Sequence, residues 1–121
     1  MKLRIKGNSI RLRLSQTEVA QFADRGVCDD SINFGVSTLN YSLEKGAETK
    51  AVFADNRVCV YVNENDANHW SSNETEVGIS HMQPIGGGSE LYILIEKDFA
   101  CLTERPFEDE SDNFPNPNTT C

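Results

Sequence analysis

One pattern of strand, turn, strand and helix occurs twice in this chain, and it limits the possible folds more than any other feature. Residues 2–6 and 10–14 alternate charged with apolar side chains, which is typical of half-buried strands. Gly7-Asn8-Ser9 between them has the composition of a tight turn. Ser15 then stands at a helix N-cap position with Glu18 three residues later, and Gly26 is placed to end that helix. The first unit is therefore predicted to be strand, turn, strand and helix.

The same order returns from residue 50. Residues 51–53 and 58–62 have strand character, Asp55-Asn56 forms the turn between them, and Asn63 is placed to cap a second helix. Matching positions lie 48 residues apart, which pairs Phe22 with Trp70. We interpret the two stretches, about residues 1–47 and 48–99, as a tandem repeat. The alternative is that this common arrangement recurs by chance.

Further strand character follows each unit, at residues 32–43 and 77–85, and Leu91–Ile95 is the most apolar run. Such a run predicts a central strand buried on both faces. The sequence thus predicts a mostly β, α+β domain over residues 1–100, whose two tandem units form one pseudo-symmetric sheet or barrel-like domain. Its predicted core contains the apolar side chains of both hairpins and one aromatic ring from each helix: Ile5, Ile10, Leu12, Leu14, Phe22, Phe53, Val58, Val60, Val62 and Trp70.

Residues 101–121 form an acidic segment that contains three prolines and has no strand or helix periodicity. Phe107 and Phe114 are its aromatic side chains, and their burial is predicted to dock the segment on the domain. The acidic side chains between them, including Asp109 and Asp112, are then expected to face the basic hairpin of residues 2–13.

The charge of the chain is polarised. The net charge is −8, yet residues 1–26 carry +4, so that the remainder carries −12. The acidic excess disfavours DNA at long range. No apolar run approaches the ~20 residues of a membrane span, and the first residues lack the apolar core of a signal peptide. A cytoplasmic protein without a membrane partner is expected, with its cysteines reduced.

Two chemical alternatives rest on the cysteines. Cys101 and Cys121 flank the acidic segment, and together with Asp109 and Asp112 they offer sulfur and oxygen ligands for a divalent metal. A thiol enzyme that pairs Cys101 with His81 is the other alternative. Otherwise the segment is a solvated acidic loop and no cofactor is expected.

Residues 6–14, Lys-Gly-Asn-Ser-Ile-Arg-Leu-Arg-Leu, followed by a short helix, resemble the N-terminal swapped-hairpin domain of antitoxin and transition-state regulators. That resemblance implies dimers of interleaved hairpins and DNA contacts from Lys6, Asn8, Arg11 and Arg13. Residues 96–102 and 108–117 resemble the end of a family of small uncharacterised bacterial proteins, which implies a bacterial origin and no particular chemistry.

These observations together favour a non-catalytic intracellular binding or regulatory module. Another protein or a second copy of the chain is the expected partner, and DNA is a further candidate that the net charge disfavours. The metal-binding protein and the thiol enzyme are the alternative functions.

Overall fold

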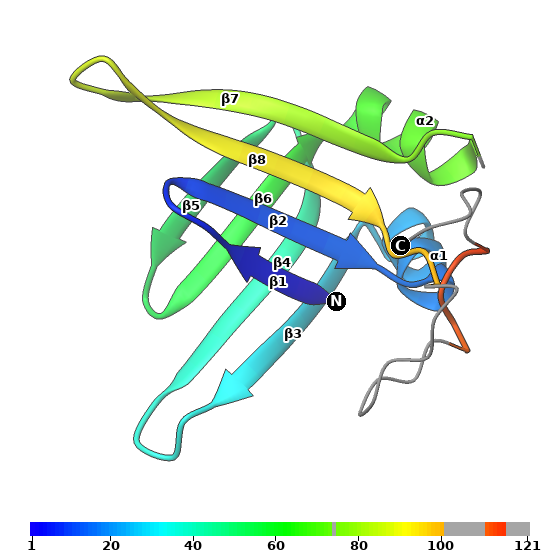
Figure 1. Cartoon of the computed structure of the whole chain (residues 1–121), viewed down its shortest axis with the longest axis horizontal. Helices are drawn as coiled ribbons and strands as arrows, with labels where there is room; N and C mark the ends of the chain where they lie inside the picture. Colours follow the sequence, from blue (N-terminus) through cyan, green and yellow to red (C-terminus); the bar gives the residue numbers. More distant parts are fainter. Residues whose placement is uncertain (74, 101–110, 116–121) are drawn as a thin grey trace.

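A computed structural model describes residues 1–73, 75–100 and 111–115 (Figure 1). Eight strands and two helices lie within this part of the chain. In chain order they are β1 (Lys2–Ile5), β2 (Ser9–Leu14), α1 (Gln16–Arg25), β3 (Val27–Asn33), β4 (Thr38–Gly46), β5 (Lys50–Ala54), β6 (Arg57–Asn63), α2 (Glu64–Ser72), β7 (Gly78–Gly86) and β8 (Ser89–Lys97).

The strands divide into two four-stranded sheets, each built from both units. We call the first unit β1 to β4 with α1, and the second unit β5 to β8 with α2. Sheet A has the order β1-β2-β8-β7, and sheet B has the order β3-β4-β6-β5. In each sheet the central pair is parallel and comes from different units, whereas the outer pairs are antiparallel hairpins of one unit. The fold is thus the predicted mostly β, α+β fold with tandem units.

The pairing registers also correspond between the units. Ile5 pairs with Ile10 in the first hairpin, and Phe53 pairs with Val58 at the positions 48 residues later. The hairpins turn at Gly7-Asn8 and Asp55-Asn56, as predicted. Asp55 and Asn56 both have positive φ, which matches the right-handed twist of a two-residue hairpin.

Both helices begin where the sequence predicts. Ser15 and Glu18 form a capping box on α1, because Ser15 Oγ accepts from the Glu18 N–H while the Ser15 N–H donates to Glu18 Oε1. Gly26 ends α1 in the left-handed conformation with φ of 77°. Asn63 caps α2 by accepting from the Asp66 N–H at 2.9 Å.

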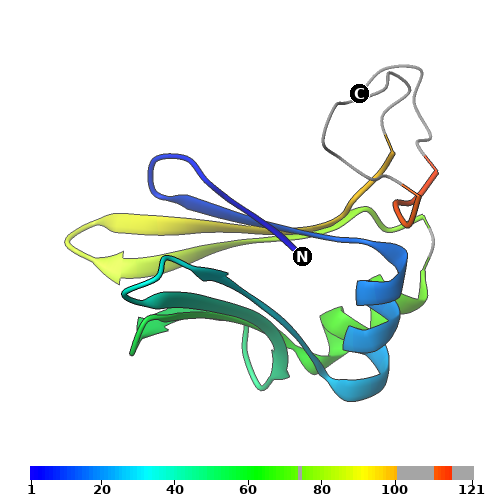
Figure 2. The same cartoon turned by 90° about the horizontal axis from the view of Figure 1, so that it is seen from below.

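The core lies between the inner faces of the sheets and is closed at one end by the helices, as Figure 2 shows. Phe22 of α1 and Trp70 of α2 are both fully buried and meet edge to face, with 6.2 Å between ring centroids. The Lys45 ammonium lies 5.8 Å from the Phe22 ring centre, and the Lys97 ammonium lies 5.7 Å from that of Trp70. The prediction that both rings are core residues is confirmed.

Two predicted core residues are exposed instead. Ile5 is 66% exposed and Phe53 is 72% exposed. Both lie beside the hairpin turns, at the end of the sheets that points away from the helices (Figure 1). Both also lie on edge strands, β1 and β5, whereas Ile10, the partner of Ile5 on the central strand β2, is buried, as are the deeper residues Leu12, Leu14, Val60 and Val62.

The prediction for Leu91–Ile95 is half right. The run lies in β8, a central strand of sheet A. However, only Ile93 and Ile95 are fully buried, whereas Tyr92 on the opposite face is 36% exposed. In the described part of the chain no helix or second sheet covers the outer face of sheet A, so the two-face burial was wrong.

Residues 111–115 dock on the domain. Phe114 pairs with Phe99 in an isolated bridge, and their ring centroids are 5.9 Å apart. Asp112 lies at the start of α1, where its carboxylate accepts from Thr17 Oγ1 at 2.9 Å and from the Thr17 N–H at 3.3 Å. The expectation that Asp112 faces the basic hairpin is therefore wrong, because the orphan donors of the helix N-terminus bind it. Phe107 lies outside the described residues.

Neither of the two described helices, α1 and α2, is long and apolar enough to cross a membrane.

Candidate functional site

The outer face of sheet A gathers the basic side chains of the first hairpin. Alternation along β1 and β2 turns the charged residues outward and the apolar residues to the core. The register places Lys2 opposite Arg13 and Arg4 opposite Arg11, and the Lys6 N–H donates to the Ser9 carbonyl oxygen beside the turn. We call Lys2, Arg4, Lys6, Arg11 and Arg13 the basic face.

Acidic groups neutralise part of the basic face. Glu96 Oε1 of β8 lies 3.2 Å from the Nε atoms of both Arg11 and Arg13, and it accepts a hydrogen bond from that of Arg13. Lys2 pairs with Asp98 at 2.8 Å. Arg4 and Lys6 make no ion pair with any residue that the structure describes. Within the described part of the chain, the cations without an ion-pair partner therefore lie at the turn end of the hairpin.

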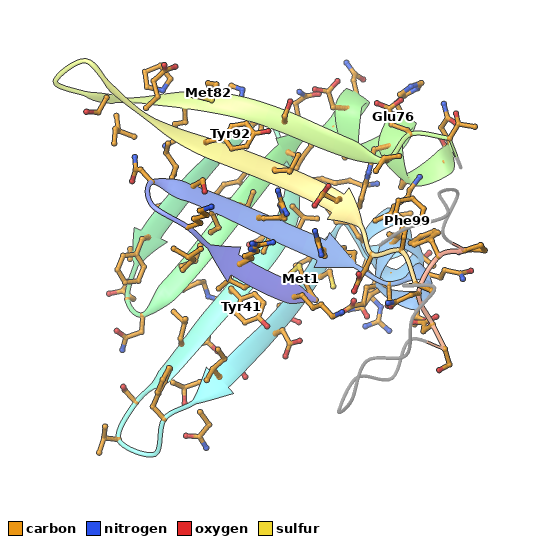
Figure 3. All side chains as sticks on the ribbon, viewed as in Figure 1. Met1, Tyr41, Glu76, Met82, Tyr92 and Phe99 are labelled. Atoms are coloured by element: carbon orange, nitrogen blue, oxygen red, sulfur yellow. The ribbon has the colours of Figure 1, made fainter. Side chains whose placement is uncertain are left out.

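A small hollow of about 160 Å³ lies at this end of the basic face. It is lined by Arg4, Lys6, Ser9, Ile10, Arg11, Tyr92 and Leu94. Tyr92 and Met82 are directly paired across β8 and β7, and Figure 3 shows them on the same part of sheet A. The hollow therefore combines guanidinium and ammonium groups with an aromatic ring.

An apolar groove of about 390 Å³ opens at the turn end of the molecule, on the inner side of both sheets. Its lining comes from both units: Ile5, Gly7, Asn8, Ser9, Ile10, Leu39, Ala51, Val52, Phe53, Val58 and Leu91. The exposed side chains of Ile5 and Phe53 belong to this groove. The two residues missing from the predicted core are thus the walls of a surface groove.

Two of the strands that line this groove, β1 and β5, are edges of their sheets. β1 and β5 each pair with one neighbour only. Gln83 of β7 spans the gap to β5, where its Oε1 accepts from the Ala51 N–H at 2.6 Å and its Nε2 donates to the Ala51 carbonyl at 3.1 Å. The Gln83 amide thus occupies the place of a neighbouring strand at Ala51. The main-chain N–H and C=O groups alternate in direction from one residue of a strand to the next. Those of Phe53, two residues after Ala51, therefore point to the same edge of β5 as those of Ala51.

The two described cysteines are free and buried. Burial raises the pKa of the Cys28 thiol to about 11. Burial also raises the pKa of Cys59, and its hydrogen bond to Glu44, at 2.8 Å, acts in the same direction. Both thiols are therefore protonated at neutral pH and are weak nucleophiles.

Three of the four predicted metal ligands, Cys101, Asp109 and Cys121, lie outside the described residues. The fourth, Asp112, binds the start of α1, and hydrogen bonds from Ser15 and Thr17 hold its pKa below the usual value. Among the residues with a described position, no group of three His, Cys, Asp or Glu side chains could hold a metal ion.

The predicted nucleic-acid residues are partly brought together. Lys6, Arg11 and Arg13 share the basic face. Asn8 lies in the turn, where its Nδ2 donates to the Glu90 carbonyl at 2.7 Å and joins the tips of two hairpins. Sequence reasoning missed Arg4, which alternation and the Gly7-Asn8 turn place opposite Arg11. It also missed Tyr92, since nothing local predicts that β8 lies beside β2.

The arrangement defines an α+β protein of two tandem units, in which each unit contributes one hairpin to sheet A and one hairpin to sheet B. The chain belongs to a family of unknown function, DUF7009, which matches residues 1–118. No curated protein matches the chain. No solved structure matches it. The resemblance to swapped-hairpin regulators stays a prediction.

Proposed function

We propose that this protein is a non-catalytic binding module that receives an extended, apolar segment of a partner polypeptide in the groove between its sheets. The observation that carries the proposal is the exposure of Ile5 and Phe53, 66% and 72%, at the mouth of an apolar groove. Exposed apolar groups of this size, gathered at one groove, are typical of binding surfaces.

The groove suits a polypeptide better than a small apolar molecule. Its walls leave most of Ile5 and Phe53 in water, whereas a small-molecule pocket usually encloses most of its ligand. In addition, the edge of β5 presents the Phe53 N–H and C=O next to the apolar walls. An extended segment supplies both apolar side chains and main-chain hydrogen bonds, which is how strands add to sheet edges.

The two described thiols offer no activated nucleophile, whereas Cys101, on which the thiol-enzyme alternative rests, lies outside the described residues. Cys28 and Cys59 are neutral at physiological pH and buried, so neither is activated as a nucleophile. Free cysteines fit a reducing, intracellular setting, which belongs to the same proposal.

Peptide selection on the full chain tests this function. A displayed library of random peptides is selected on the wild-type protein, and the affinities of the enriched peptides are measured for Phe53→Ser, Ile5→Ser and Phe34→Ser. Phe34 is the matched control, because it is 64% exposed but lies outside the groove. Circular dichroism verifies that each variant is folded.

We expect enriched peptides with apolar residues at alternate positions. Phe53→Ser should weaken them roughly 10-fold to 100-fold, which corresponds to the burial of one phenylalanine side chain. Phe34→Ser should leave their affinity unchanged. The proposal is wrong if no peptide is enriched, or if the enriched peptides bind Phe53→Ser as well as the wild type.

A further inference from the structure

We propose that the hollow on the outer face of sheet A binds the phosphate group of a nucleotide, free or within a single strand, with the base stacked on Tyr92. This site and the proposed peptide groove both include Ser9 and Ile10 in their linings, but Arg4, Lys6 and Tyr92 line the hollow alone, whereas Ile5 and Phe53 line the groove alone. Variants of Ile5 and Phe53 therefore test the peptide groove, and variants of Arg4, Lys6 and Tyr92 test the hollow independently.

The arrangement of charges points to an anionic ligand. Arg4 lies directly opposite Arg11, and Lys2 lies opposite Arg13. Like charges at directly opposed positions destabilise a strand pair. Glu96 and Asp98 offset part of this repulsion, but they lie toward the end of the face that is remote from the turn. Arg4 and Lys6 remain without an acidic partner in the described part of the chain, and both line the hollow.

Sheet B provides an internal comparison, because the same framework holds different side chains there. Forty-eight residues after Arg4, Lys6, Arg11 and Arg13 stand Val52, Ala54, Cys59 and Tyr61. These residues occupy the same register positions on β5 and β6. The hairpin therefore folds without cations at these positions, so that their presence on sheet A is not required by the fold.

The size and composition of the hollow select a nucleotide. Its volume of about 160 Å³ accommodates a phosphate group with a few waters, since a water molecule takes ~30 Å³ in the liquid. Guanidinium groups such as those of Arg4 and Arg11 bind phosphate oxygens with two parallel hydrogen bonds. Tyr92, which is 36% exposed, offers a ring on which a base can stack.

The same features disfavour duplex DNA. The basic face extends over only about 14 Å, because Lys2 and Lys6 are four residues apart at ~3.4 Å each. Tight duplex binding uses about 6 to 10 phosphate contacts. The remainder of the chain is acidic and the net charge is −8, which repels a long polyanion.

Fluorescence anisotropy of a short labelled oligothymidylate tests the site on the full chain at low salt. Unlabelled thymidine monophosphate, inorganic phosphate and a duplex of the same length serve as competitors. The variants are Arg4→Ala, Lys6→Ala, Tyr92→Ala and Glu96→Gln. Lys50→Ala and Arg57→Ala, which remove cations from the outer face of sheet B, are the matched controls.

We expect Arg4→Ala and Lys6→Ala each to weaken binding about tenfold, the effect of one charged hydrogen bond. Tyr92→Ala should weaken it about tenfold through lost stacking. Glu96→Gln should strengthen binding, because it releases Arg11 and Arg13 for the ligand. Lys50→Ala and Arg57→Ala should have no effect.

Several outcomes would overturn the proposal. Absence of binding at low salt does so, as does equal loss in the variants of sheet B, which would indicate unspecific charge attraction. Competition by inorganic phosphate as strong as that by thymidine monophosphate, with Tyr92→Ala unchanged, would show an anion site without base recognition. Stronger binding of the duplex would exclude the single-strand ligand.

Discussion

Replacement of Trp70 by phenylalanine tests how the two units are joined at the helices. Trp70 is fully buried, its ring packs edge to face on Phe22, and its indole N–H donates to the Val77 carbonyl at 3.1 Å. Trp70→Phe keeps an aromatic ring against Phe22 but removes the indole hydrogen bond and part of the ring volume.

The structure sets the size of the effect. The Val77 carbonyl also accepts from the Lys97 N–H at 3.0 Å, so it is not left unsatisfied, and the lost hydrogen bond is worth about 1 kcal/mol. The smaller ring leaves a void of roughly 40 Å³, which at ~24 cal/mol per Å³ adds about 1 kcal/mol. Trp70→Phe should therefore lower the free energy of unfolding by about 2 kcal/mol.

Urea denaturation followed by far-ultraviolet circular dichroism measures this change, because Trp70 is the one tryptophan in the sequence and its fluorescence is lost in the variant. Phe34→Leu, at an exposed position, is the control and should shift stability by less than ~0.5 kcal/mol. A change for Trp70→Phe as small as that of the control would refute the reasoning that the helix contact is a principal part of the core.

Three further predictions concern the docked segment, a turn and a thiol. Phe114→Ala should lower the free energy of unfolding by about 1 to 2 kcal/mol in urea denaturation, because Phe114 packs on Phe99; an unchanged midpoint would show that the packing adds nothing. Asn56→Gly should increase the free energy of unfolding by about 0.5 kcal/mol, because φ of 59° suits glycine better than asparagine, and the melting temperature should rise slightly. A lower melting temperature would contradict the turn geometry. Cys28 holds its proton in the folded chain until about pH 11 but releases it near 9.0 when unfolded, so stability should fall over this range by roughly 2 to 3 kcal/mol. Cys28→Val should flatten that fall in urea titrations at several pH values, and an equally steep fall in the variant would assign it to other groups.

Local structure was predictable because it depends on residues close in sequence. The alternation in residues 10–14, the Gly7-Asn8 and Asp55-Asn56 turns and the Ser15 to Glu18 capping box all combine groups within a few positions. The spacing of 48 residues then predicted that the hairpins and helices correspond. Each of these features was confirmed.

The arrangement of the units in space was not predictable in the same way. Which strand lies beside β2 depends on contacts between residues about 80 positions apart, such as Leu12 with Ile95. A strand that alternates charged and apolar residues can pair equally well with different neighbouring strands, so its own sequence does not identify its partner. The exposure of Ile5 and Phe53 follows from this arrangement, because it decides which end of the sheets the helices cover.

The candidate sites follow the same division. Lys6, Arg11 and Arg13 were found because they are neighbours on one hairpin, and the hairpin register adds Arg4. Tyr92 completes the hollow from the other unit, and the apolar groove needs walls from both. Surfaces that combine two units require the fold before they can be recognised.

Comparison of the two units separates side chains that the fold requires from side chains that are free to serve another purpose. The buried positions agree in character: Leu12 corresponds to Val60, Leu14 to Val62, and Phe22 to Trp70. So do the lysines that lie over the helix rings, Lys45 and Lys97.

The outward positions differ. Where sheet A has Arg11 and Arg13 around Glu96, sheet B has Cys59 and Tyr61 beside Glu44, and Cys59 Sγ hydrogen-bonds to that carboxylate. The acidic residue is thus common to both sheets, but it neutralises cations in one and accepts from a thiol in the other. Because the same backbone tolerates both sets, selection on folding alone does not account for the cations. From this asymmetry between otherwise matching sheets we expect variants of Arg4 and Lys6, on the outer face of sheet A, to alter ligand binding and to leave stability unchanged.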